Sequence, residues 1–245
     1  MTGRALKWIA AITMVIDHFS VVCLGSLMEG VPDLSIPSLY AGAVNGDGQQ
    51  TLLYWLALIF RCIGRISFPI FCFLLTEGFC HTKNLKKYMG RLALFALISE
   101  IPFDFAIFGH LNFQLQNTFF VLLIGLMVLY GIDAVERRGS GTNLPFLLTP
   151  LIVLAGCSVS VLLNTDYSVL GVLLIAAFYL LRDSKFERTI FSALLCLSEY
   201  TAVFASLPIW FYNGRPGKSR FRYFFYWFYP VHLLILGGIR GMIGG

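Results

Sequence analysis

Long apolar runs alternate with short polar connectors along the whole chain. Their lengths predict about eight membrane-crossing helices near residues 5–25, 51–79, 89–109, 117–132, 144–163, 167–182, 188–210 and 222–240. A helix needs about 20 apolar residues to cross a bilayer, so the run at 167–182 is short. The pattern predicts an all-α fold, a polytopic membrane helix bundle in which residues 1–245 form a single domain.

Composition supports a location in the bilayer. Hydrophobic residues make up 58% of the chain and charged residues only 13%. A soluble domain carries about 25% charged residues. The six cysteines all lie in or beside apolar runs, and none forms a C-x-x-C pair. They are therefore interpreted as small membrane hydrophobes rather than a disulfide framework or a metal site.

Lysine and arginine gather in alternate connectors, which predicts the orientation in the membrane. The N-terminal segment and the connectors CHTKNLKKYMGR, DAVERRG and RDSKFER are basic, whereas the connectors 26–50, 110–116 and NTDYS contain no lysine or arginine. This alternation predicts a multi-pass protein of the bacterial cytoplasmic membrane with its N-terminus in the cytoplasm.

The connector NGRPGKSRFR departs from the alternation. It contains four basic residues, yet simple counting places it outside the cell. Either residues 188–212 double back near Glu199 as two half-spans, or the basic connector faces outward. The four basic charges favour the first alternative. Such a connector can bind the phosphates of a ligand or anchor the protein to anionic lipid.

Several charged and histidine residues interrupt the apolar runs. Charged groups at mid-membrane depth are costly and rarely face lipid, so they mark candidate functional positions. They are Asp17, His18, Arg61, Arg65, Glu77, Glu100, Asp104, Glu199 and His232. At 1.5 Å per residue, Arg61 and Glu100 lie about 15 and 13 Å below the outer ends of their helices. This predicts an Arg61–Glu100 contact and one layer of charge that also contains Asp17, His18 and Asp104.

His18 is the strongest candidate for chemistry in this layer. Histidine titrates near neutral pH and can pass a proton in either direction. Neighbouring residues on a helix do not face each other, so Asp17 is expected to contact Arg61 or Arg65 rather than His18. The structural alternative is that Arg61, Arg65 and Glu100 form ion pairs that only fix helix packing.

Lys7 precedes His18 by eleven residues, which is close to three helical turns. Both side chains therefore lie on one helix face, about 16 Å apart along the axis. A groove along this face would have a cation at its inner mouth and a proton acceptor near its far end. Such a groove suits acetyl-coenzyme A, which has phosphates at one end and a reactive thioester at the other. The alternative is an ordinary lysine that extends its ammonium group to the membrane edge.

The sequence resembles the TraX family, membrane proteins associated with acetylation of conjugative pilin. The resemblance rests on the segments LKWIAAITMVIDHFS, RCIGRISFPIFCFLLTEGFCHTKNLKKY, RLALFALISEIPFDFA, QNTFFVLLIGL, DYSVLGVLLIAAFYL and RYFFYWFYPVHLLIL. It covers most of the chain but not the loop after the first apolar run or residues 139–163. It implies a membrane-embedded acyltransferase.

The family is similar to larger transmembrane acyltransferases that move acyl groups from cytoplasmic acyl-CoA to an acceptor. Those enzymes carry a basic residue, ten intervening residues and a histidine in their first helix, a spacing that Lys7 and His18 match. Lysine replaces the usual arginine, so the phosphate contact would be less directional. The segment FYWFYPVHLLIL resembles the aromatic–histidine element of their late helices, with His232 at its histidine.

The resemblance implies that His18 is the general base, which takes a proton from the acceptor amine or hydroxyl. Asp17 would orient or balance the site. Depth and charge, rather than the family, make Arg61 or Arg65 candidates for stabilising the oxyanion, with Glu100 in the same catalytic layer.

The remaining site residues would bind the two substrates. The candidates for contacting the acceptor are Asn117, Asp104 and His232, although an asparagine at a helix start more often caps the helix. The candidates for the coenzyme phosphates are Lys7, Lys83, Lys86, Lys87, Arg215, Lys218, Arg220 and Arg222, provided that their connectors face the cytoplasm.

These observations predict a membrane acetyltransferase that uses acetyl-CoA as its donor. A peptide N-terminus, a sugar or a lipid would each fit as acceptor, and no nucleic acid is expected.

No H-E-x-x-H or G-x-S-x-G motif occurs, so neither a metal centre nor a serine nucleophile is predicted. Cys23 or Cys62 offers an acyl-enzyme route, but neither has an adjacent base in the sequence, so direct transfer is the simpler hypothesis.

Two other classes of function fit parts of the pattern. A proton-coupled small-molecule transporter would use Asp17, His18 and Glu100 as a proton relay. A non-catalytic assembly factor would hold a secreted subunit in the membrane and would need no layer of charge. Substitution of His18 separates the three, because only the enzyme loses group transfer while it keeps donor binding.

Overall fold

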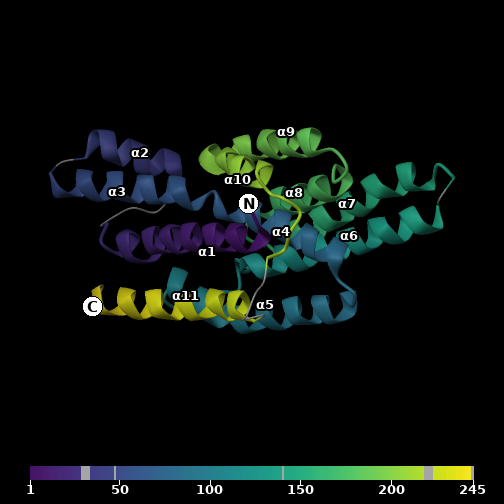
Figure 1. Ribbon diagram of the computed structural model, residues 1–245. Coiled ribbons are helices and arrows are strands. Elements are labelled where there is room, and N and C mark those ends of the chain that lie inside the picture. The colour runs from purple at the N-terminus through teal and green to yellow at the C-terminus, as the bar shows by residue number, and fades with distance from the viewer. Residues whose placement is uncertain (29–33, 47, 140, 218–222, 244–245) are drawn as a thin grey trace.

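The computed structural model describes residues 1–28, 34–46, 48–139, 141–217 and 223–243, and it is a bundle of helices (Figure 1). The helices are α1 (Gly3–Phe19), η1 (Ser20–Leu24), α2 (Ile36–Asn45), α3 (Gln49–Gly64), α4 (Ser67–His81), α5 (Leu85–Ile107), α6 (Thr118–Arg138), α7 (Leu144–Leu162), α8 (Ser168–Leu180), α9 (Lys185–Cys196), η2 (Leu197–Ala205), α10 (Ser206–Trp210) and α11 (Phe224–Ile243). The described residues form no strand, so the predicted all-α class is confirmed.

Short polar residues fix where several helices begin. Each places a side-chain oxygen on a backbone N–H of the first turn, which satisfies a donor that the helix cannot pair. These capping residues are Thr2, Ser35, Asn84, Asn117 and Ser184.

The C-terminal end of α5 is capped by a residue of α11. The Arg240 guanidinium donates to the carbonyl oxygens of Ala106 and Ile107 at 3.0 and 2.7 Å, which ties the end of α11 to α5.

Five helical stretches are long and apolar enough to cross a membrane, judged by length and composition. They are Gly3–Leu24, Gln49–His81, Thr118–Arg138, Leu144–Leu162 and Lys185–Trp210. Their outward surfaces are apolar: Phe146 and Leu162 of α7 are 85% and 83% exposed, as a lipid-facing helix requires. These features indicate a membrane protein, but the predicted number of about eight spans is not confirmed.

The stretch Lys185–Trp210 reverses direction rather than running straight. Its backbone breaks at Glu199 and at Tyr200, which has a φ of 54°. As a result α9 and α10 lie side by side (Figure 1), and the Lys185 ammonium at the start of α9 lies 4.9 Å from the centre of the Trp210 ring. The prediction that this segment doubles back near Glu199 is therefore confirmed.

The reversal returns the chain to the N-terminus. The Met1 ammonium donates to the carbonyl oxygen of Phe211 at 2.6 Å, and the backbone N–H of Gly3 donates to the carbonyl of Arg215 at 2.8 Å. The segment before the basic connector thus lies at the same end of the bundle as the N-terminus. We call this the basic end, because Lys83 of the α4–α5 connector and Lys87 at the start of α5 line one cavity with Lys7 of α1 there.

Close packing around α1 positions the site. The helix packs against α3, α4 and α11, and α3 meets α4 at a bend at Arg65 and Ile66. Gly64 lies so close to Asp17 that an added Cβ would overlap the Asp17 side chain. This glycine lets α3 approach α1 closely enough for the polar side chains of both helices to meet.

Candidate functional site

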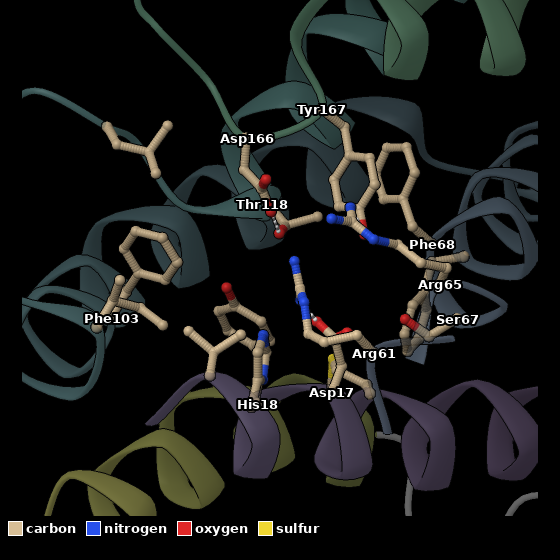
Figure 2. A pocket seen from close by; sticks show the side chains of 16 residues that line it. Asp17, His18, Arg61, Arg65, Ser67, Phe68, Phe103, Thr118, Asp166 and Tyr167 are labelled. Atoms are coloured by element: carbon tan, nitrogen blue, oxygen red, sulfur yellow. Dashed lines mark hydrogen bonds and ion pairs between the residues drawn. The ribbon is translucent and has the colours of Figure 1, made fainter. Parts of the chain in front are cut away.

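A polar cavity of about 200 Å³ lies where α1, the α3–α4 bend, the start of α6, the α7–α8 connector and α11 converge. Figure 2 shows Asp17 and His18 pointing into it from α1, with Thr118, Asp166 and Tyr167 on the opposite wall. The charged and hydrogen-bonding residues that line it include Asp17, His18, Arg61, Arg65, Thr118 and Asp166. Phe68, Phe71 and Phe103 close its sides.

A second histidine holds His18. Nδ1 of His18 lies 2.6 Å from Nε2 of His232, and the two rings stack with their centres 4.9 Å apart. Nδ1 of His232 lies 2.8 Å from the carbonyl oxygen of Phe228 on its own helix. The expected partner of His18 on another helix is thus His232, which the sequence resemblance had placed at an aromatic–histidine element.

This chain of contacts determines the tautomer of His18. A carbonyl oxygen only accepts hydrogen bonds, so Nδ1 of His232 must carry a proton and donate to Phe228. Nε2 of a neutral His232 is then an acceptor, and Nδ1 of His18 must donate to it. The remaining nitrogen, Nε2 of His18, keeps its lone pair on a ring that lines the polar cavity. The arrangement suits a general base.

Asp17 pairs with Arg61. The carboxylate Oδ2 accepts a hydrogen bond from Nη1 of Arg61 at 2.7 Å, and both side chains are only 12% exposed. Nε of Arg61 also donates to the carbonyl oxygen of Leu34 at 3.3 Å. The expectation that Asp17 contacts an arginine rather than the adjacent His18 is confirmed. Arg61 is therefore a fixed charge on the cavity wall.

Arg65 lies at the bend between α3 and α4 and pairs with Glu199. Its Nη1 lies 2.7 Å from the Glu199 carboxylate and 3.4 Å from the Tyr167 hydroxyl. The Tyr167 ring stacks on Phe68 at a centre-to-centre distance of 3.7 Å. Arg65 thus links the broken helix η2 to the α7–α8 connector, a contact that the sequence did not predict.

The predicted Arg61–Glu100 contact is wrong. The Glu100 carboxylate accepts hydrogen bonds from the backbone N–H of Asn117 at 3.2 Å and from the Asn117 side-chain amide. Asp104 accepts from the backbone N–H of Asn112 at 2.9 Å. Glu100, Asp104 and Asn117 are not among the described residues that line the polar cavity. They hold the connection between α5 and α6, which does not support their predicted catalytic and acceptor-binding roles.

Thr118 and Asp166 are cavity residues that the sequence reasoning missed. The Thr118 hydroxyl donates to the Asp166 carboxylate at 2.7 Å. Burial raises the pKa of Asp166, and the hydrogen bond from Thr118 opposes this shift. Both residues lie in segments quoted for the family resemblance, QNTFF and DYS, but nothing in those segments indicated that two connectors meet at one cavity.

A larger cavity of about 630 Å³ opens at the basic end, and we call it the donor groove after the role that we propose for it. It is lined by the basic residues Lys7, Lys83, Lys87 and Arg91 together with aromatic and apolar side chains. Four residues line both cavities and form the junction between them: Met14, Phe71, Thr118 and Tyr229. The cavity lined by basic side chains therefore adjoins the cavity that contains His18.

The donor groove contains some of the predicted phosphate-binding residues. Lys7, Lys83 and Lys87 line it, as does Arg91, which the sequence reasoning did not select. Lys86 and Arg215 are not among the described residues that line either cavity. The other candidates, Lys218, Arg220 and Arg222, lie outside the described residues.

Comparison with known proteins assigns the chain to a family. The family model described as TraX protein matches residues 2–240. A relative from Dichelobacter nodosus, described as a probable fimbrial assembly protein FimC of serogroup H1, is 30% identical over 262 residues. The alignment covers 94% of this chain and 92% of that protein. No solved structure matches. The chain belongs to the TraX family.

Proposed function

We propose that this protein is a membrane acetyltransferase that moves an acetyl group from acetyl-CoA to an amine or hydroxyl of an acceptor, with His18 as general base. The observation that carries the proposal is that the basic donor groove adjoins, at four shared residues, the cavity with an unprotonated Nε2 of His18. A phosphate-bearing thioester fits that order of chemical groups.

The donor groove supports an acyl-CoA as the donor. The coenzyme has anionic phosphates at one end, and Lys7, Lys83, Lys87 and Arg91 supply positive charge at the mouth of the groove. The chain between the phosphates and the thioester is long and uncharged, and the groove is also lined by Tyr88, Leu122, Phe225 and similar residues. The thioester would then reach the junction beside His18.

Direct transfer accounts for the groups present. Nε2 of His18 takes the proton of the acceptor amine or hydroxyl as that atom attacks the thioester carbonyl carbon. The new bond forms while the carbonyl electron pair moves to oxygen. When the carbonyl re-forms, the carbon–sulfur bond breaks and the departing sulfur takes the proton from His18. Cys23 and Cys62 are not among the described residues lining either cavity, which disfavours an acyl-enzyme route.

The relative suggests the class of acceptor. The protein from Dichelobacter nodosus is described as a fimbrial assembly protein, and the family is associated with pilin. We therefore include the N-terminal amine of a pilin-type subunit as the first acceptor to test, before a sugar or a lipid. The basic end would face the cytoplasm of a bacterial inner membrane, where acetyl-CoA is available, and the acceptor would enter from the other side.

A proton-coupled transporter is the alternative that the acid–histidine set suggested. It relied on Asp17, His18 and Glu100 acting in one layer. Glu100 instead binds Asn117 away from the polar cavity, and Asp17 is paired with Arg61. These contacts leave the relay without its third member, so the enzyme is the better-supported function.

The proposal is tested with the purified protein in lipid nanodiscs. Acetyl-CoA binding is measured by calorimetry, and release of free coenzyme A is followed with a thiol reagent, with and without a peptide that has a pilin-type N-terminal amine. We expect saturable binding and coenzyme A release that requires or is accelerated by the peptide. A protein that neither binds acetyl-CoA nor consumes its thioester would contradict the proposal.

A further inference from the structure

The junction between the two cavities contains a buried hydroxyl that makes no well-formed hydrogen bond with the described residues. Tyr229 of α11 lines both cavities and is only 5% exposed. Its hydroxyl lies near Thr118, but it reaches normal hydrogen-bond geometry neither with Thr118 nor with any other described residue. A buried polar group that makes no hydrogen bond costs about 1–3 kcal/mol, so native proteins rarely retain one without a reason.

The Tyr229 ring is held in place from several sides. It meets the Phe119 ring edge to face at 5.0 Å and the His232 ring at 5.6 Å between centres. Its centre lies 6.0 Å from that of the His18 ring, again at a steep angle. These contacts fix the direction of the hydroxyl before any ligand binds, which is the condition for effective electrostatic stabilisation.

Elimination shows that Tyr229 is the free donor at the junction. The side chains of Met14 and Phe71 carry no N–H or O–H group, and the Thr118 hydroxyl already donates to Asp166 at 2.7 Å. Of the four residues that line both cavities, only Tyr229 has an uncommitted side-chain proton. The arginines considered for this task, Arg61 and Arg65, line the polar cavity but are not among the described residues that line the donor groove.

We propose that the Tyr229 hydroxyl is the hydrogen-bond donor that binds the thioester carbonyl of the donor and stabilises the oxyanion of the tetrahedral intermediate. The inference rests on the proposed acetyl transfer. Tyr229 donates a hydrogen bond and transfers no proton, because the acceptor proton passes to His18 and then to the departing sulfur. This assignment replaces Arg61 and Arg65 in the oxyanion role.

The matched pair for the test is Tyr229→Phe and Tyr130→Phe. Tyr130 lies on α6, is 53% exposed and is not among the described residues that line either cavity. Both substitutions remove one hydroxyl and keep the ring. In nanodiscs, kcat for coenzyme A release, the acetyl-CoA dissociation constant and the thermal unfolding temperature are measured for each variant and for the wild type.

We expect Tyr229→Phe to lower kcat by about 10²–10³-fold, the usual effect of removing one oxyanion donor. Its acetyl-CoA affinity should stay near that of the wild type, and its unfolding temperature should be equal or higher, because the unpaired hydroxyl is gone. Tyr130→Phe should keep its kcat. An unchanged kcat in Tyr229→Phe would overturn the inference, as would a loss of rate matched by lost stability. An inactive wild type would instead count against the proposed function.

Discussion

The chemical state of His18 depends on a residue 214 positions further along the chain. The Phe228 carbonyl fixes the proton on His232, and His232 in turn fixes the proton on His18. Two hydrogen bonds thus fix the tautomer of His18 in the structure. If His18 is the general base, as we propose, His232 acts through it as a positioning residue rather than a catalytic residue.

The first prediction concerns His232. His232→Leu removes the acceptor that orients the His18 ring, so kcat should fall by about 10²-fold or more, in the range for a general base that loses its orientation. Donor affinity should not change. His232→Gln can offer its side-chain oxygen to Nδ1 of His18, and it should recover part of the lost rate. Steady-state kinetics of the two variants check this, and equal rates in the leucine and glutamine variants would contradict it.

The second prediction concerns the Asp17–Arg61 pair. Removing one partner of a buried ion pair leaves an uncompensated charge, which costs about 3–5 kcal/mol. Asp17→Asn and Arg61→Met should each lower the free energy of unfolding, whereas the double variant should lose less than the sum of the two. A double-mutant cycle from unfolding in detergent measures this coupling. Strict additivity would mean that the 2.7 Å contact contributes nothing.

At the scale of elements, helix contacts bring polar groups from distant segments to one cavity. Gly64 allows α3 to lie against Asp17 of α1, and the bend after α3 turns Arg65 toward the re-entrant segment. The α7–α8 connector adds Asp166 opposite α1. The cavity therefore depends on the close approach of α1 and α3.

The third prediction follows from that approach. Gly64→Ala would place a methyl group within the Asp17 side chain, so the two helices must separate. Overpacking of this kind costs about 1–3 kcal/mol, and the displacement of Asp17 should also lower acetyl transfer. Gly90→Ala in α5 is the control, because an added Cβ there meets no atom within 4 Å. Thermal unfolding and turnover are compared; a stable, fully active Gly64→Ala variant would contradict the packing argument.

At the scale of the whole molecule, two cavities of unlike character share one junction. The donor groove opens among basic residues, and the polar cavity contains a histidine, two arginines and two aspartates. The bundle thereby separates the place where a phosphate-bearing donor would bind from the place where an acceptor would react. Both meet at Tyr229 and Thr118.

The fourth prediction uses two adjacent lysines. Lys87 lines the donor groove and Lys86 does not, although both are exposed. A charge-assisted hydrogen bond contributes about 1.5–3 kcal/mol, so Lys87→Ala should weaken acetyl-CoA binding by about tenfold or more. Lys86→Ala should bind as the wild type does. Calorimetry in nanodiscs measures both constants, and equal weakening by the two variants would indicate only a general effect of positive charge.

The features that could be predicted from the sequence are those that depend on a single helix or on a local pattern of charge. The apolar runs, the reversal near Glu199 and the contact of Asp17 with an arginine follow from periodicity, charge and helix geometry. The Arg61–Glu100 contact failed because depth along a helix does not reveal which helices are neighbours. In the structure α1 supplies the partner of Arg61, and the start of α6 supplies that of Glu100.

Other site residues gave no usable sequence signal. Tyr229 is one of 11 tyrosines in the chain, and it stands in an aromatic run where a lipid-facing ring would look the same. Asp166 lies in a short polar connector of ordinary composition. Their importance arises only when α11, the α7–α8 connector and α1 meet, which is a property of tertiary packing.

The most direct test of the acetyl-transfer account is a single-turnover measurement with His18→Gln. Wild-type protein and the variant, each in nanodiscs and loaded with acetyl-CoA to the same measured occupancy, are mixed with acceptor peptide, and acetylated peptide is quantified by mass spectrometry. If His18 is the general base, the variant binds acetyl-CoA as the wild type does but forms product at least about 10²-fold more slowly. Equal rates at equal occupancy would contradict the role of His18 as the general base.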